Sequence, residues 1–230
     1  MWNTERGAFY LNITEIKLVE YSRAEERVNS ASHAAGLILS ALIVMFCLLP
    51  AVRAGNMLSI VCASLYLFGI TVMFIGSALY HAAKPGKAKK ILRVLDHCMI
   101  FFAVAGTAAG CVPAVFDTVG TFAAVLMLIA AWTGAVFGLI VTLTGFEKSR
   151  GLQLAVYIIT ALVCAVCGCG AYFRLPIWAF FAFLGGSGLL IAGIIIYGLG
   201  RTRKWYHSVF HFFILGGLFV YWLGIAEYCY

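Results

Sequence analysis

Seven long apolar runs, separated by short polar segments, account for most of the sequence. They cover residues 28–49, 57–82, 95–116, 119–144, 152–173, 177–199 and 205–227. Each run is long enough to cross the hydrocarbon core of a membrane, which takes about 20 helical residues. No alternating apolar and polar pattern of the kind found in membrane β-strands recurs, and backbone groups in lipid must pair internally. The pattern therefore predicts an all-α fold, a seven-helix transmembrane bundle over residues 28–230.

Residues 1–27 form a separate, polar tail. The tail contains nine charged side chains and no apolar stretch of signal-peptide length. A cleaved signal peptide is therefore not expected. Two alternatives stay open for residues 8–19, a short amphipathic helix on the membrane surface or a loosely ordered segment.

Composition and charge agree with a multi-pass membrane protein and predict its orientation. Hydrophobic residues make up 63% of the chain and charged residues 11%, against about 25% charged residues in soluble domains. Of the 16 Lys and Arg residues, only Arg53 and Arg174 lie on the side opposite the tail. The positive-inside rule then places the N-terminus in the cytoplasm and the C-terminus outside. The net charge of +7 is typical of basic loops facing anionic lipid, and no nucleic-acid partner is expected.

The eight cysteines do not form the spacing pattern of a disulfide framework. Seven of them lie inside apolar runs, and Cys164, Cys167 and Cys169 fall within one predicted helix. On a helix, positions 164 and 167 share a face and position 169 points elsewhere. We interpret the three as small packing residues rather than as a metal site.

Histidines and an aspartate gather at the ends of the apolar runs. Ser77 and His81 close the second run, Asp96 opens the third, and His207 and His211 open the seventh. A charged residue at the centre of a membrane helix costs roughly 2.5 to 3.5 kcal/mol, so such residues need a reason to be there. With the predicted topology, all of these helix ends lie on the cytoplasmic side at similar depth.

Residues four apart on a helix lie on one face, a spacing that suits two imidazoles binding one ion. His207 and His211 have this spacing, and His81 would supply a third imidazole. Three imidazoles leave one position of a tetrahedral Zn²⁺ open, as in catalytic rather than structural zinc sites. Asp96 would then hold or deprotonate a water, with the Ser77 hydroxyl one turn deeper than His81.

The plainer alternative is an interfacial histidine hydrogen-bonded to a backbone carbonyl, which is the usual state of a lone histidine. This alternative is favoured for His97. Adjacent helical positions lie about 100° apart, so if Asp96 faces the metal, the side chain of His97 points away from it. His33, near the start of the first helix, fits a place beside the ligands, but no spacing argument puts it on the metal.

These motifs together resemble the haemolysin III branch of the progestin and adipoQ receptor family, which is similar to the alkaline ceramidases. The matching elements are Asn29, Ser32, His33 and Gly36 as N-x-x-[S/T]-H-x-x-G, Ser77 to His81 as S-x-x-x-H, Leu95-Asp96-His97, and His207 to His211 as H-x-x-x-H. The resemblance implies a bacterial plasma-membrane protein with zinc held by His81, His207 and His211. It also implies that Asp96 and Ser77 lie near a bound water. We expect Asn29, His33 and His97 as candidate neighbours of the ligands.

Three functions are compatible with this sequence. The first is a zinc-dependent hydrolase that cleaves an amide or ester of a membrane lipid from the inner leaflet. The second is a receptor-like sensor of membrane state in which zinc is structural. The third, a haemolysin-like pore or a transporter, ranks lowest, because polar residues concentrate at one end of the helices instead of forming a stripe along them. Membrane lipids are the expected partners, and the oligomeric state stays open.

Overall fold

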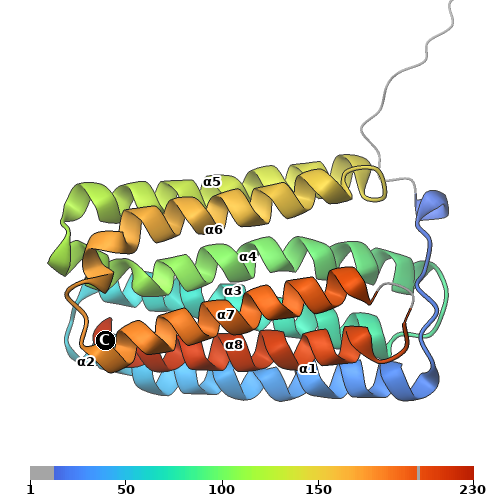
Figure 1. Ribbon diagram of the computed structural model, residues 1–230, viewed down its shortest axis with the longest axis horizontal. Coiled ribbons are helices and arrows are strands. Elements are labelled where there is room, and N and C mark those ends of the chain that lie inside the picture. The colour runs from blue at the N-terminus through green and yellow to red at the C-terminus, as the bar shows by residue number, and fades with distance from the viewer. Residues whose placement is uncertain (1–12, 201–202) are drawn as a thin grey trace, which may run out of the picture.

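The computed structural model describes residues 13–200 and 203–230, and within them the fold is all-α (Figure 1). The elements are η1 (Ile13–Glu15), α1 (Arg23–Ile43), η2 (Val44–Leu48), α2 (Leu49–Arg53), α3 (Met57–Ala82), α4 (Lys87–Thr118), α5 (Thr121–Gly145), α6 (Arg150–Tyr172), α7 (Ile177–Leu199) and α8 (Tyr206–Tyr228). η1 is a 3₁₀ turn, and η2 is a π-helical turn that joins α1 to α2 in one continuous span. The described residues thus contain seven helical segments long and apolar enough to cross a membrane. The predicted seven-helix bundle is confirmed.

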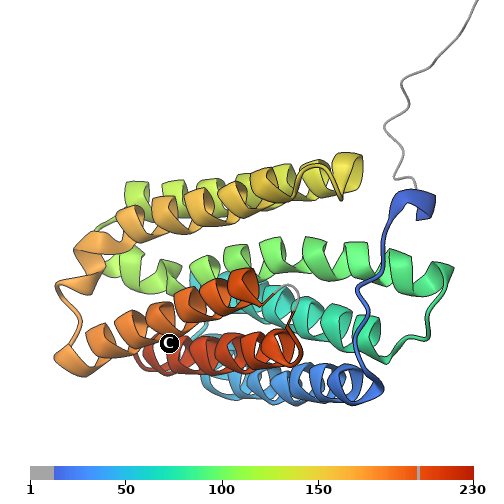
Figure 2. The same cartoon turned by 45° about the vertical axis from the view of Figure 1, so that its right-hand side comes forward.

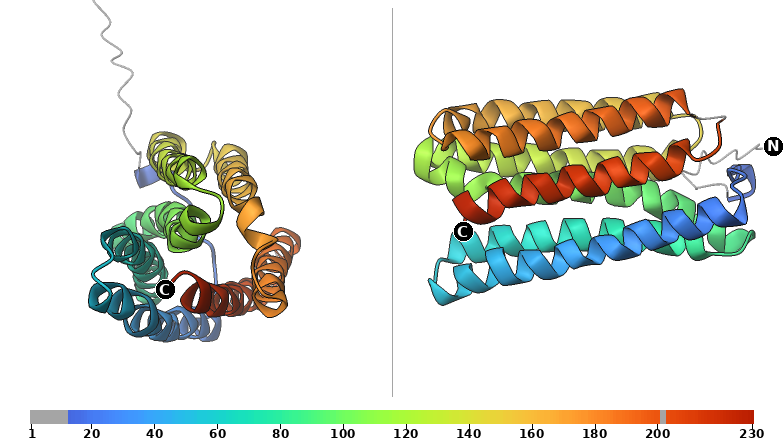
Figure 3. Two further views of the ribbon diagram at one scale, coloured as in Figure 1. Left: turned by 90° about the vertical axis from the view of Figure 1, so that its left-hand side faces the viewer. Right: turned by 60° about the horizontal axis from the view of Figure 1, so that its bottom comes forward.

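The helices run roughly side by side, as the end-on view in Figure 3 shows. α3 packs on α1 and α4, α5 packs on α4 and α6, and α8 packs on α1 and α7. α4 is the most buried of the spans. Small residues allow close approach here, since a Cβ added to Gly69 of α3 would lie 2.1 Å from the Phe102 carbonyl oxygen of α4. The tight α3–α4 pair fixes the last turn of α3, which carries His81, relative to the third turn of α4, which carries Asp96.

Two helices begin earlier than their apolar runs. α1 starts at Arg23, where Ser22 and Glu25 form a capping box, so the helical domain begins before residue 28. α4 starts at Lys87 instead of residue 95, and its first two turns contain four basic residues. Lys89 and Arg93 are nevertheless buried, because each pairs with a glutamate of another segment. A hydropathy pattern assigns such residues to a loop, whereas the fold uses them as inward-facing helix positions.

Residues 13–22, here called the N-terminal strap, run across one end of the bundle (Figures 1 and 2). The strap passes from the loop between α5 and α6 to the start of α1, and Ile16 is buried against Val94, Cys98 and Phe146. Residues 16–22 are not helical, so the predicted surface helix is wrong over residues 16–19. Residues 8–12 lie outside the described part of the chain, and there the surface helix stays a prediction. The C-terminus lies at the opposite end of the bundle.

All eight cysteines are free. Cys164 is buried, Cys167 is half-buried and Cys169 is exposed. The exposed position of Cys169 agrees with the helical spacing, in which positions 164 and 167 share a face of α6 and position 169 points elsewhere.

Candidate metal centre

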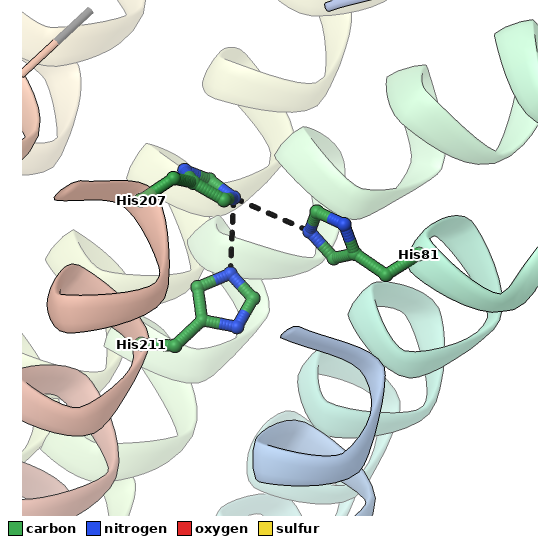
Figure 4. Close-up of side chains that lie close together, drawn as sticks. All are labelled: His81, His207 and His211. Carbon is green, nitrogen blue, oxygen red and sulfur yellow. Dashed lines mark hydrogen bonds between the residues drawn. The ribbon is translucent and has the colours of Figure 1, made fainter. Parts of the chain in front are cut away.

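Three histidine side chains meet at the end of the bundle crossed by the strap (Figure 4). His81 comes from the last turn of α3, and His207 and His211 come from the first two turns of α8. The Nε2 atom of His207 lies 3.2 Å from Nε2 of His81 and 3.0 Å from Nε2 of His211. One ligand atom from each residue lies within 4.8 Å of the other two, close enough to hold a metal ion.

The start of α8 is held in place by α1. Trp205, just before α8, has a left-handed backbone with φ of 69°, which is uncommon for a residue with a side chain. Its backbone N–H donates to Oε1 of Glu25 at 2.7 Å. This bond fixes the point where α8 begins and therefore the direction in which His207 projects.

The hydrogen bonds of two rings assign their tautomers. Nδ1 of His81 lies 2.7 Å from Oε2 of Glu26, and Nδ1 of His211 lies 3.3 Å from the carbonyl oxygen of Asn29. A carboxylate and a carbonyl only accept, so each Nδ1 carries the proton and each Nε2 presents a lone pair. Nε2 of His207 can donate to at most one of these two atoms. The three nitrogens thus converge with at most one proton among them, which is an arrangement suited to a cation.

The spacing fits a small transition-metal ion. Two nitrogens bound at 2.0 to 2.1 Å in a tetrahedral site are about 3.3 to 3.4 Å apart. The two Nε2 separations of 3.0 and 3.2 Å are close to that value. Imidazole nitrogen suits Zn, Cu, Fe and Ni, so this donor set fits a transition-metal ion and does not distinguish among these four.

Unpartnered polar atoms surround the cluster. Among the described residues, no hydrogen-bond partner is found for Nδ1 of His207, for Oγ of Ser208, or for the side chains of Asn29 and His33, although these atoms are buried. Buried polar groups are normally hydrogen-bonded, and exceptions concentrate at sites that take water, ions or ligands. Six of the eleven such atoms among the described residues lie in this region, which supports a binding site here.

The residues predicted to act on water lie nearby but do not bond to the histidines. Ser77 is buried one turn before His81 on α3. Asp96 is half-buried where α4 passes Gly76, and its carboxylate lies 3.8 Å from Nδ1 of His97. Neither Asp96 nor Ser77 is hydrogen-bonded or ion-paired to the three histidines in the part of the chain that is described. Their catalytic roles stay predictions.

Two of the three residues expected around the ligands touch one of them, and the third does not. The ring of His33 stacks on His211 at 3.7 Å between centroids, and Asn29 contacts His211 through its carbonyl oxygen. His97 instead bonds to the Arg93 carbonyl oxygen at 3.0 Å, and its ring meets the edge of Phe146. His97 therefore serves packing between α4 and its neighbours.

Some side chains that had no predicted role contact the histidines or their partners. Glu26 bonds to His81, Lys89 bonds to Glu26, and the Tyr21 ring stacks on His207 at 4.9 Å. Burial raises the pKa of Tyr21 above its usual value, so its hydroxyl stays protonated. Helical spacing could have indicated Glu26, because it lies one and two turns before Asn29 and His33 on one face of α1. Nothing in the local sequence singles out Lys89 or Tyr21.

A cavity of about 280 Å³ leads to the cluster from the side of the strap. Its walls include Tyr21 of the strap, Tyr197 of α7 and Lys204 before α8, and His207 is the one metal-cluster residue among them. His81 and His211 are 2% and 1% exposed, so access from this cavity is by way of His207.

Known proteins are similar to this chain over most of its length. The sequence profile of a family described as haemolysin-III related matches residues 21–222. The chain is 24% identical over 213 residues to a hemolysin-3 homolog of Bacillus subtilis (strain 168), covering 89% of this chain and 94% of the relative. It is 26% identical over 193 residues to hemolysin-3 of Bacillus cereus, covering 84% of this chain and 86% of that relative.

Proposed function

We propose that this chain, which belongs to the haemolysin-III related family of multi-pass bacterial membrane proteins, binds zinc and hydrolyses an amide or ester of a membrane lipid at the cytoplasmic leaflet. The observation that carries the proposal is the convergence of three imidazole Nε2 atoms, two of them held as lone-pair donors by Glu26 and Asn29. Three protein ligands leave an open coordination position, which is typical of catalytic zinc. Bound zinc would polarise a carbonyl and lower the pKa of water to about 7.

The place of the cluster in the membrane supports a lipid substrate. The histidines lie at helix ends, beside the basic side chains Lys89 and Lys204, and not at mid-span. Helix ends lie at the boundary between hydrocarbon and headgroups, and lipid ester and amide linkages lie at the same depth. The positive-inside rule assigns this end to the cytoplasm.

The roles of the chain's own residues follow from their positions. Asp96, which is not among the three ligand residues, would take a proton from water during attack on a carbonyl. Ser77 supplies a buried hydroxyl one turn below His81. Tyr21, stacked on His207, limits the water that reaches the cluster.

Asp96→Asn tests the hydrolase proposal. The variant should retain its metal and lose turnover by a factor on the order of 10² to 10⁴, the usual contribution of a general acid or base. Asp117→Asn is the matched control, because Asp117 is an exposed aspartate at the far end of the same helix. Fatty acid release would be measured from ceramides, acyl amides and phospholipid esters in mixed micelles. If no substrate gives release above a metal-stripped control, the hydrolase proposal is wrong.

A sensor with structural zinc is the second candidate. The observation that favours it is the cover over the site, since the strap places Tyr21 against His207 and two of the ligands are almost fully buried. Under this proposal Asp96→Asn changes stability or signalling, and there is no hydrolysis to lose. A pore ranks below both, because the buried positions along the spans are mainly apolar.

A further inference from the structure

The carboxylate of Glu26 connects the candidate metal centre to a buried lysine on α4. Glu26 of α1 uses both oxygens, Oε2 at 2.7 Å from Nδ1 of His81 on α3 and Oε1 at 2.7 Å from Nζ of Lys89 on α4. We infer that Glu26 is a positioning residue that sets the metal affinity of the centre through His81, and that Lys89 holds Glu26 in place for this task. The inference rests on the proposed metal site and adds residues beyond its ligands.

The contact with His81 has the geometry of an outer-shell carboxylate. A carboxylate that accepts from the Nδ1–H of a ligating histidine fixes the ring and its tautomer and makes Nε2 a better donor. His81 has no exposed side-chain surface, and Nδ1 is its only polar atom besides the Nε2 that faces His207. Loss of Glu26 therefore leaves the ring without an anchor on its far side. Such losses typically lower metal affinity by about 10- to 100-fold.

Lys89 is placed to fix the carboxylate. Its side chain is 4% exposed, and its Nζ also donates to the carbonyl oxygen of Ala83 at 3.0 Å, where α3 ends. The ammonium group lies 5.0 Å from the centroid of the Tyr80 ring. With Nζ held from three sides, Glu26 is held in one orientation, with Oε2 directed at His81.

Stability alone is a weak reason for this arrangement. Replacing a buried ion pair with apolar residues of similar size is often neutral or stabilising, because desolvation offsets the attraction between the charges. The same three helices already pack through apolar contacts, such as those of Phe74 with Gly36. The second oxygen of Glu26 contacts His81, a candidate metal ligand. Positioning of His81 therefore explains the Glu26–Lys89 pair better than stability does.

The experiment is a metal competition assay on the purified full chain in detergent, with zinc and a chromophoric chelator. Glu26→Gln keeps an acceptor and removes the charge, whereas Glu26→Leu removes both. We expect affinity losses in the order Leu greater than Gln, within about 10- to 100-fold for the larger loss. Lys89→Met should give a smaller loss in the same direction. In a His81→Ala background, Glu26→Gln should add no further loss, because the two residues act as one unit.

The control is Glu227→Gln, the same carboxylate-to-amide change at an exposed position near the end of α8, away from the histidines. Its equilibrium affinity for zinc should equal that of the wild type. If Glu26→Leu and Glu26→Gln lower only the thermal stability of the metal-free protein and bind zinc as the wild type does, Glu26 is merely a tether between helices and the inference is wrong. If the wild type itself binds no zinc, the proposed function fails instead, so the two failures are distinguishable.

Discussion

Loosening the N-terminal strap should open the covered face of the metal centre. The strap is fastened by Glu147 in the loop between α5 and α6, which accepts from Arg93 Nη1 at 2.6 Å and from the backbone N–H of Lys17 at 3.2 Å. Arg93 also donates to the carbonyl oxygen of Lys17. Glu147→Gln keeps an oxygen acceptor at this point and removes its charge.

The size of the effect follows from the change in hydrogen-bond type. Bonds to a charged group contribute about 1.5 to 3 kcal/mol and neutral bonds about 1 kcal/mol, so roughly 0.5 to 2 kcal/mol is lost. The side chain of Glu147 is 25% exposed, so solvent screening places the loss near 1 kcal/mol. A loss of about 1 kcal/mol raises the equilibrium constant for local opening about fivefold.

Hydrogen–deuterium exchange over residues 16–22 measures this opening. Exchange should be about fivefold faster in Glu147→Gln than in the wild type, with no change in the cores of α3 and α4. Lys148→Gln is the control, because Lys148 is an exposed neighbour whose side chain makes no hydrogen bond or ion pair with the described strap residues 13–22. Equal exchange in Glu147→Gln and wild type, or equal acceleration in both variants, would refute the fastening role of Glu147.

The pH dependence of the strap, the ligand set and the topology can each be tested. Burial alone would raise the pKa of Glu147, but the neighbouring guanidinium groups hold it below its ordinary value of 4.5. Strap anchoring should therefore persist above pH 4.5 and be lost as the pH falls through the lowered pKa. A spin label in the strap should become more mobile as the pH falls, and in Glu147→Gln it should be mobile already at neutral pH. Zinc at about 100 times its Kd should stabilise both the wild type and His97→Ala by about 2.7 kcal/mol, and His81→Ala far less. Thermal unfolding in detergent measures these gains, and equal gains in all three proteins would contradict the assignment of ligands. In a cysteine-free background, a cysteine at position 87 should react with an impermeant reagent only from the cytoplasm and one at position 174 only from outside, and the opposite result would invert the topology.

The spans could be predicted from sequence because crossing a membrane imposes a length and an apolar composition on each helix. The expected runs 57–82 and 177–199 coincide with α3 (Met57–Ala82) and α7 (Ile177–Leu199). The spacing of His207 and His211 is likewise a local property of a helix. The remaining step, bringing His81 to them, depended on the predicted topology, which put the end of one helix and the start of another on the same side.

The surroundings of the histidines could not be predicted in this way. Lys89 and Arg93 look like loop residues in sequence, and only their pairing with Glu26 and Glu147 allows them to be buried. The strap has no periodic pattern, so the stacking of Tyr21 on His207 depends on tertiary contacts made far along the chain. These contacts join residues that are distant in sequence, and the pattern along a single segment carries no record of them.

The metal content of the purified chain, combined with zinc K-edge absorption, tests the central claim most directly. The account predicts about one zinc per chain, bound by three imidazole nitrogens at 2.0 to 2.1 Å. The double variant His207→Ala, His211→Ala should contain none. A wild-type chain that stays free of metal at micromolar zinc, or a double variant that keeps the same zinc signal, would contradict the account.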